Sequence, residues 1–163
     1  LLHYVQSLHL HIDLLINNGA VVIRKLGTAY EYEDILNSVM VNIFGPQYLT
    51  VEVLKLWKQC KVINICSQAA IEVFSEHSIY AASKAALRQF TFCLQSDGFD
   101  TIVLNPDKTK TDVNPDGGRD PQEVAKVLVK YLQGLIALKP YEDLNVWEHI
   151  TKRAVSAKKA CTY

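Results

Sequence analysis

A tyrosine and a lysine four positions apart, Tyr80 and Lys84, are the residues of this chain best suited to acid–base chemistry. At the start of a helix this spacing places both side chains on one face. A phenol with a pKa of about 10 is a poor proton donor at neutral pH. A neighbouring ammonium is expected to lower the pKa of Tyr80 and make it a usable general acid or base. The hydroxyl of Ser67, thirteen residues earlier, is expected to hold a substrate carbonyl oxygen beside the tyrosine. Because a lone Y-x-x-x-K pattern also occurs on structural helices, the surrounding sequence decides between the two interpretations.

The elements that position these residues alternate between short apolar runs and helical stripes. Strands are predicted over 12–16, 61–65 and 101–104. Helices are predicted over 1–10, 33–56, 78–94 and 122–138. Pro46 is expected to kink or interrupt the second helix. This alternation predicts an α/β fold with a doubly wound parallel sheet, as a single domain over 1–163. Ligands of such sheets bind beyond the carboxyl ends of the strands, where this chain has turns at 17–19, 66–67 and 105–106.

Composition and charge argue against several classes of protein. The chain has 163 residues with 17 basic and 17 acidic side chains, a balance that is untypical of nucleic-acid binders. Its apolar runs are too short for a membrane span, and its first residues do not resemble a signal peptide. We therefore expect a cytoplasmic protein.

The four cysteines form no C-x-x-C pair and are expected to be reduced thiols. His9 and His11 have no further ligand at metal-binding spacing, so no metal is expected. Because the chain does not begin with methionine, we interpret it as a fragment, a processed product or an edited sequence.

Five motifs, in order over about residues 11–113, resemble the short-chain dehydrogenase/reductase family. Residues 11–20, H-I-D-L-L-I-N-N-G-A, are similar to the family's D-x-L-x-N-N-A-G with the last two residues transposed. Asn42 in V-N-I-F-G matches the asparagine of its mid-helix V-N-x-x-G. V-I-N-I-C-S resembles the strand that ends in the catalytic serine, here Ser67, and Y-A-A-S-K-A-A starts at Tyr80. The loop that starts at Asn105, N-P-D-K-T-K-T-D, resembles N-P-G-x-x-x-T-D.

The resemblance implies a Rossmann-like fold and hydride transfer between a nicotinamide cofactor, NAD or NADP, and a carbonyl or alcohol substrate. Tyr80 would exchange a proton with the reacting oxygen, and Ser67 would orient that oxygen. Lys84 would lower the pKa of Tyr80 and hold the nicotinamide ribose, and Asn42 would hold a water that links Lys84 to solvent. Residues 17–20 would line the adenosine-ribose side, and Thr111 would meet the carboxamide. The implied cofactor contacts are Asn17, Asn18, Gly19, Ala20, Tyr80, Lys84, Pro106, Asp107, Thr109 and Thr111.

The resemblance also implies a homo-oligomer, because family members commonly associate through the helices that carry Tyr80 and Asn42. Phe44, Phe90 and Phe92 are candidates for that face, although at least one of them is expected to lie in the core. The segments around 108–120, 141–147 and 71–74 are expected to border the substrate. Trp147, Tyr141 and the apolar residues of 71–74 would form an apolar wall suited to a hydrophobic carbonyl compound, or would serve packing alone.

Several features depart from the family pattern. Members begin with a glycine-rich T-G-x-x-x-G-x-G turn that binds the pyrophosphate, and this sequence contains no such motif. The first matching motif corresponds to the family's fourth strand, so the chain is interpreted as a carboxyl-terminal, catalytic half whose first strand is an exposed edge. Residues 21–23 would then meet water or a partner. Asp107 replaces a glycine after the proline, is expected to tolerate a positive φ, and would place a negative charge near an anionic cofactor.

The motifs and the departures from them are compatible with two functions of different classes. The first is an NAD(P)-dependent oxidoreductase in which Ser67, Tyr80 and Lys84 are intact. The second is a truncated, non-catalytic relative that acts as an interaction or signalling module, as the absent phosphate turn and Asp107 suggest. A parallel α/β domain with coincidental motifs is a third, simpler interpretation. We hypothesise that the isolated polypeptide does not bind dinucleotide tightly.

Overall fold

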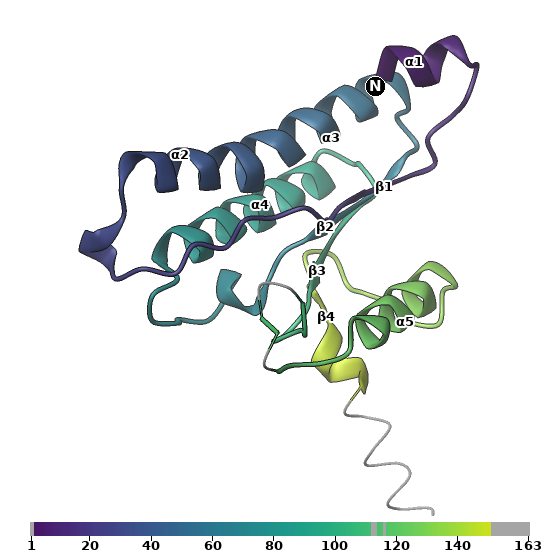
Figure 1. The fold of residues 1–163 in the computed structure, drawn as a ribbon. Coiled ribbons are helices and arrows are strands. Elements are labelled where there is room, and N and C mark those ends of the chain that lie inside the picture. Colours follow the sequence, from purple (N-terminus) through teal and green to yellow (C-terminus); the bar gives the residue numbers. More distant parts are fainter. Residues whose placement is uncertain (1, 112–113, 116, 151–163) are drawn as a thin grey trace, which may run out of the picture. The chain divides into compact units, whose positions relative to one another are not determined.

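The computed structural model describes residues 2–111, 114–115 and 117–150 (Figure 1). In chain order its elements are α1 (Leu2–Ser7), β1 (Leu14–Asn17), η1 (Gly27–Ala29), α2 (Tyr32–Val39), η2 (Met40–Phe44), α3 (Gly45–Leu56), β2 (Lys61–Ile65), η3 (Gln68–Ala70), α4 (Ser78–Ser96), β3 (Thr101–Asn105), α5 (Pro121–Leu132) and β4 (Leu144–Asn145). The alternation of strands and helices predicted from the sequence is confirmed.

The strands form one four-stranded sheet in the order β1-β2-β3-β4. β1 pairs parallel to β2 with Leu14 opposite Lys61, and β3 pairs parallel to β4 with Leu104 opposite Leu144. The predicted α/β class with a parallel, Rossmann-like sheet is therefore confirmed. Contacts within the chain group into two compact units, Leu1–Val103 and Leu104–Tyr163, which we describe separately. The single domain over 1–163 stays a prediction.

The core of the first unit lies between the sheet and two helices. Val53, Leu54 and Trp57 at the end of α3 are buried together with Cys60 and Val62. The alternation of side chains along a strand explains this arrangement, because successive residues point to opposite faces. Leu15 therefore packs on this core, whereas its neighbours along β1 do not.

β1 lies at one end of the strand order, as the sequence predicted. Leu14 and Ile16 on its other face are 37% and 40% exposed, respectively. Residues 21–23, which were expected to meet water or a partner, are all half-buried, so water reaches them only in part. Their contact with a partner stays a prediction. Apolar side chains at a sheet edge are a usual site of association with further strands.

A π-helical segment joins α2 to α3 without a break in the helical run. The backbone N–H of Gly45 donates to the carbonyl of Met40, five residues back. Pro46 follows directly, and in a regular helix its ring would clash with the carbonyl four residues earlier. The wider π turn removes that clash. A Cβ at Gly45 would lie 3.2 Å from the Met40 carbonyl oxygen, so a glycine suits this turn. Instead of the kink or interruption expected at Pro46, the structure shows a local widening of the helix.

The predicted helix over 122–138 is too long. α5 ends at Leu132, because Gly134 adopts a left-handed φ of +74°. The N–H of Leu135 then reaches back to the carbonyl of Lys130 at 2.9 Å, which closes the helix end. Beyond it, the short strand β4 was not predicted at all.

A buried polar network ties four elements of the first unit together. The Asn17 amide at the end of β1 donates to Thr50 Oγ1 of α3 at 2.9 Å and to Asn64 Oδ1 of β2 at 2.8 Å. Asn64 Nδ2 donates in turn to Thr91 Oγ1 of α4 at 2.8 Å. Thr50, Asn64 and Thr91 are fully buried, so each lost hydrogen bond leaves a polar group without water.

We expect Thr91→Val to lower the free energy of unfolding by about 1–3 kcal/mol, because it leaves the buried Asn64 amide without its acceptor while keeping the side-chain shape. Urea unfolding followed by circular dichroism measures this. Thr28→Val, at an exposed threonine of η1, is the matched control and should change stability little. Equal stabilities of the two variants would contradict the structural role of the network.

Candidate active site

Ser67 and Tyr80 come together at the carboxyl end of β2. Ser67 caps η3, and its Oγ accepts a hydrogen bond from the N–H of Ala69 at 3.1 Å. Tyr80 lies in the first turn of α4, and its side chain is hydrogen-bonded to that of Ser67. The two hydroxyls that the sequence predicted to act on one oxygen atom are therefore neighbours.

Lys84 lies one helical turn after Tyr80 and is 2% exposed. Its Nζ donates to the carbonyl oxygen of Ile65 at 2.8 Å and lies 5.9 Å from the centre of the Tyr80 ring. An ammonium has three N–H donors, and the Ile65 carbonyl engages one of them. The residue thus has further donor capacity of the kind that ribose hydroxyls accept.

The pKa values of this pair differ from the sequence-based expectation. Burial raises the pKa of the Tyr80 phenol above its ordinary value, and the hydrogen bond with Ser67 opposes this with a smaller effect. Burial lowers the pKa of the Lys84 ammonium. The expected lowering of the Tyr80 pKa by Lys84 is therefore wrong for this structure, because removal from water disfavours both charged forms. Tyr80 is consequently a neutral phenol at physiological pH, able to donate its proton.

Asn42 is fully buried in the π-helical segment and binds protein groups on two sides. Its Oδ1 accepts from the N–H of Val21 at 2.8 Å, and its Nδ2 donates to the carbonyl of Val21 at 2.8 Å. Nδ2 also donates to Ser83 Oγ of α4 at 3.0 Å, and that hydroxyl donates to the carbonyl of Tyr80 at 2.7 Å. Asn42 therefore links the segment after β1 to the helix that carries Tyr80. Its role in holding a water stays a prediction.

The stretch from Asn17 to Ala20 divides into two parts. Asn17 belongs to the buried network described above, whereas Asn18, Gly19 and Ala20 are exposed. A Cβ at Gly19 would meet nothing within 4 Å, and Gly19 does not adopt a positive φ. The transposed Gly-Ala order thus places no strain on the backbone. Contact of these residues with a cofactor stays a prediction.

In the second unit, Asp107 forms an ion pair with Arg119. Asp107 Oδ2 lies 2.5 Å from Arg119 Nε, and Thr109 Oγ1 donates to the Asp107 carbonyl at 2.9 Å. The negative charge expected at Asp107 is therefore offset by a residue that sequence reasoning missed. Nor does Asp107 use the positive φ that was considered for it. Pro106 is half-buried, and the exposed Thr111 pairs with Asn114.

One oxygen atom of the Asp107 carboxylate is suited to accept a hydrogen bond from a ligand. Oδ1 is buried and has no hydrogen-bond partner among the residues that the structure describes. A carboxylate oxygen accepts hydrogen bonds readily, so it matches an amide such as the carboxamide of a nicotinamide. For the pyrophosphate the sequence offers no glycine-rich turn. The described residues thus fit the nicotinamide end of a dinucleotide.

Three apolar side chains in the segment between Ser67 and Tyr80 are exposed. Val73 is 101% exposed, and Ile71 and Phe74 are also exposed. The rings of Phe74 and His77 lie 6.1 Å apart, and those of His77 and Tyr80 lie 6.3 Å apart. A row of rings thus leads away from the Tyr80 phenol. Of the other residues expected to form an apolar wall, Tyr141 is exposed and Trp147 is half-buried in the second unit.

The described part of the chain contains no group of three or more His, Cys, Asp or Glu side chains arranged to hold a metal ion. None of its helices combines the length and the apolar character that crossing a membrane requires. Cys60, Cys66 and Cys93 are all thiols, and Cys161 lies outside the described residues.

Sequence comparison identifies the family to which the chain is similar. The model of the short chain dehydrogenase family matches residues 1–121, which is more than half of the chain. L-xylulose reductase from Caenorhabditis elegans is 33% identical over 128 residues, covering 74% of this chain and 51% of that reductase. The chain therefore spans about half the length of this curated relative.

Solved structures agree on the fold. 4-Hydroxyisoleucine dehydrogenase complexed with NADH superposes with a TM-score of 0.77 at 18% identity, covering 88% of this chain and 71% of that chain. A gluconate 5-dehydrogenase from Burkholderia cenocepacia J2315, in complex with NADP and tartrate, has a TM-score of 0.60 at 25% identity, covering 69% and 47%. Both similar structures hold a nicotinamide cofactor, one as NADH and the other as NADP.

The buried Lys84 predicts a specific dependence of stability on pH. Because folding lowers the pKa of Lys84, the unfolded chain binds more protons than the folded chain between the two pKa values. Stability should rise with pH in that window, by at most about 1.4 kcal/mol per pH unit, and the rise should end near the ordinary lysine pKa of about 10.4. We expect Lys84→Met to remove this rise, as urea unfolding of both proteins from pH 7 to 10 would show. Lys58→Met, at an exposed lysine, is the control. A difference between wild type and Lys84→Met that stays constant with pH would contradict the prediction.

Proposed function

Because this chain belongs to the short-chain dehydrogenase family, we propose that it forms the catalytic half of an NAD(P)-dependent oxidoreductase that interconverts a carbonyl compound and an alcohol. The observation that supports this most is the hydrogen-bonded pair of hydroxyls, Ser67 and Tyr80, with the buried Lys84 one turn away. In this proposal Tyr80 is the general acid or base, Ser67 orients the substrate oxygen, Lys84 holds the nicotinamide ribose, and Asn42 supports them.

The reaction is balanced by one hydride and one proton. A nicotinamide cofactor, when bound, would supply the hydride for the carbonyl carbon, or would accept it from the alcohol carbon in the reverse direction. In the reduction, the Tyr80 O–H donates its proton to the carbonyl oxygen as the C–H bond forms, so a neutral alcohol results. The raised pKa of Tyr80 keeps that proton in place at neutral pH. The Ser67 hydroxyl stabilises the developing charge on the same oxygen.

We assign the remaining cofactor contacts as the family resemblance implies. Residues 17–20 and the segment with Pro106, Asp107, Thr109 and Thr111 contact the dinucleotide. The buried Oδ1 of Asp107 supports a contact with a donor group of the cofactor. Whether NAD or NADP is used depends on the part of the fold that binds the adenosine ribose. The thiol state of the described cysteines supports the proposal of a cytoplasmic location.

The proposal is tested by binding and turnover of the 163-residue chain with NADH and NADPH. Without a pyrophosphate-binding turn, we expect weak binding, without saturation at micromolar cofactor in a fluorescence titration. At millimolar cofactor, or in a longer form of the protein, Tyr80→Phe should retain cofactor binding and lose turnover by about a hundredfold or more.

Tyr32→Phe is the matched control, because Tyr32 is 71% exposed at the start of α2. It should bind cofactor and turn over as the wild type does. Turnover by Tyr80→Phe at the wild-type rate would overturn the assignment of Tyr80. Absence of cofactor binding at millimolar concentration in every form would favour the non-catalytic interaction module.

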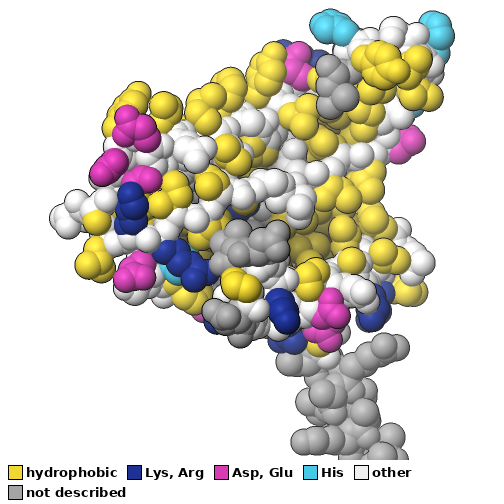
Figure 2. All heavy atoms as spheres, in the orientation of Figure 1, with side chains coloured by type: hydrophobic (Ala, Val, Ile, Leu, Met, Phe, Trp, Pro, Cys, Tyr) yellow, Lys and Arg dark blue, Asp and Glu magenta, His cyan; other side chains and the backbone are white. Residues whose placement is uncertain are grey.

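We further propose that the protein is a homo-oligomer that associates through the exposed face of α2, η2 and α3. Apolar side chains recur along this run at helical spacing and are all exposed: Leu36, Met40, Phe44, Tyr48 and Val51. Phe44 is 52% exposed, and its ring stacks on that of Tyr48 with the centres 5.7 Å apart. Figure 2 shows hydrophobic side chains along the upper edge of the view, over the helices α2 and α3 of Figure 1. Phe92 is buried, so it serves the core, and Phe90 packs on the same cluster.

Light scattering coupled to size-exclusion chromatography tests this association. Phe44→Glu places a charge in the centre of the apolar row, so we expect its mass to fall to that of one chain. Val73→Glu adds the same charge at a fully exposed position outside the row and should leave the mass unchanged. A wild-type chain that is already monomeric at high concentration would overturn the proposal.

A further inference from the structure

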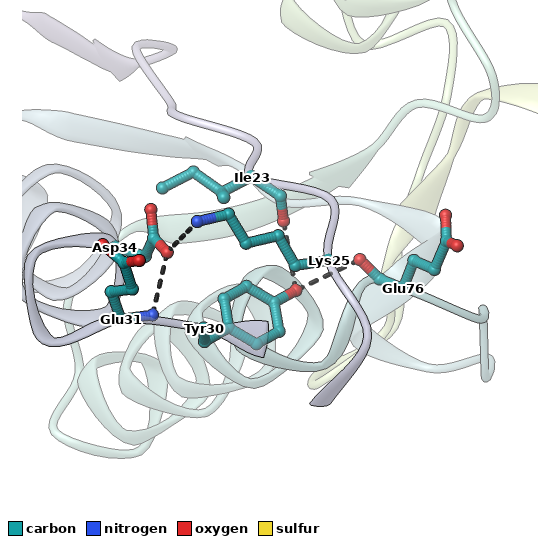
Figure 3. Close-up of polar contacts among 6 residues, drawn as sticks. All are labelled: Ile23, Lys25, Tyr30, Glu31, Asp34 and Glu76. Atoms are coloured by element: carbon teal, nitrogen blue, oxygen red, sulfur yellow. Dashed lines mark hydrogen bonds and ion pairs between the residues drawn. The ribbon is translucent and has the colours of Figure 1, made fainter. Parts of the chain in front are cut away.

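A cluster of polar contacts holds the turn that precedes α4 (Figure 3). Glu76 in this turn adopts a φ of +62°, a left-handed conformation that residues with a side chain seldom adopt. Its carbonyl oxygen accepts two hydrogen bonds, from the N–H of Lys25 at 3.2 Å and from the hydroxyl of Tyr30 at 3.1 Å. Such a strained backbone conformation persists where its surroundings hold it.

Both donors belong to the segment between β1 and α2, and this segment is itself anchored. Lys25 Nζ lies 2.5 Å from Asp34 Oδ2, in the first turn of α2. The same Asp34 oxygen accepts from the N–H of Glu31 at 2.9 Å as part of a capping box. The Tyr30 hydroxyl also lies 3.1 Å from the carbonyl of Ile23, so its single proton is shared between two carbonyls. The donors to Glu76 are thus fixed to a helix end.

The turn at Glu76 lies directly before the start of α4. His77 follows it as the N-cap of α4, and no side-chain hydrogen bond caps this helix. The His77 ring contacts the Tyr80 ring at 6.3 Å between centres. One turn later, Ser83 is held by Asn42. Tyr80 therefore lies between two attachment points, Glu76 and Ser83, and both are made by the segment 21–42.

We propose that Tyr30 is a positioning residue for Tyr80: its hydroxyl, together with the Lys25 amide, keeps Glu76 in the left-handed turn and thereby fixes the first turn of α4. This inference rests on the proposed function, because the position of Tyr80 affects a reaction rate only where Tyr80 transfers a proton. Tyr30 itself touches no reacting atom.

Three variants of the 163-residue chain test the inference. Tyr30→Phe removes only the hydroxyl, and Tyr32→Phe makes the same change at an exposed tyrosine of the same segment. The double variant Tyr30→Phe/Glu76→Gly introduces a residue that adopts a positive φ without steric cost. It should therefore restore the turn without the hydrogen bond.

Two measurements need no activity. Hydrogen exchange reports the backbone amides of residues 77–80, and an NMR titration of tyrosine carbons, assigned with Tyr80→Phe, reports the Tyr80 phenol. We expect Tyr30→Phe to speed the exchange severalfold and to shift the Tyr80 titration, and the double variant to return both to the wild-type behaviour. Where the protein turns over, kcat should fall about tenfold with KM nearly unchanged, because a misplacement of about 1 Å costs about a hundredfold in rate and the displacement expected here is smaller.

The outcomes separate this inference from the proposed function. Exchange and titration in Tyr30→Phe that equal those of Tyr32→Phe would overturn the inference, whatever the activity. Faster exchange with an unchanged Tyr80 titration would also overturn it, because the hydroxyl would then support the fold alone. A wild-type protein that neither binds cofactor nor turns over would refute the proposed function, while the exchange and titration data would still decide the role of Tyr30.

Discussion

The described geometry of the first unit depends on the hydrogen bonds that the Asn42 side chain makes. It is fully buried and simultaneously binds the backbone of Val21 and the hydroxyl of Ser83. The π turn that holds it exists because Pro46 cannot follow a regular helix, and Gly45 leaves room for the carbonyl of Met40. A backbone irregularity thus aims one amide at two segments far apart in the sequence. Without that amide, the N–H and carbonyl of Val21 would lack their partners.

Burial of polar groups connects stability to chemistry in this unit. Lys84 and Tyr80 lie where the strand β2 gives way to a turn, and both are largely withdrawn from water. This placement disfavours their charged forms and therefore costs folding free energy at some pH values. The same placement leaves a neutral phenol beside a serine hydroxyl and an ammonium with donor capacity. A local conflict between stability and residue type is common at functional sites.

Sequence patterns predicted the parts of this structure that follow local rules. The apolar run at 61–65 and the apolar stripe from 78 onward predicted β2 and α4. Because ligands of parallel sheets bind at the carboxyl ends of the strands, the sequence also predicted that Ser67 and Tyr80 act at the same place. Contacts between loops follow no periodicity, so the sequence indicated neither the bond between Tyr30 and the Glu76 carbonyl nor the pair of Asp107 with Arg119. The predicted direction of the Tyr80 pKa shift was also wrong. Burial raises this pKa, and burial depends on packing that the spacing of Tyr80 and Lys84 does not reveal. The helix predicted to reach residue 138 ends at Leu132, shortly before Gly134. The sequence alone did not show whether this glycine ends the helix or lies within it.

The groups proposed to take part in proton transfer lie together in one unit of the chain. Asn42, Ser67, Tyr80 and Lys84 all belong to the unit Leu1–Val103. Their contacts described above are made by residues of the same unit, from Val21 and Asn42 to Ile65 and Ser83. The described arrangement of these four side chains is therefore made without a glycine-rich turn. A glycine-rich turn at a helix N-terminus is a common means of binding a pyrophosphate, and the sequence contains none. The geometry around Tyr80 is thus a property of the unit Leu1–Val103, and it can be measured independently of cofactor affinity.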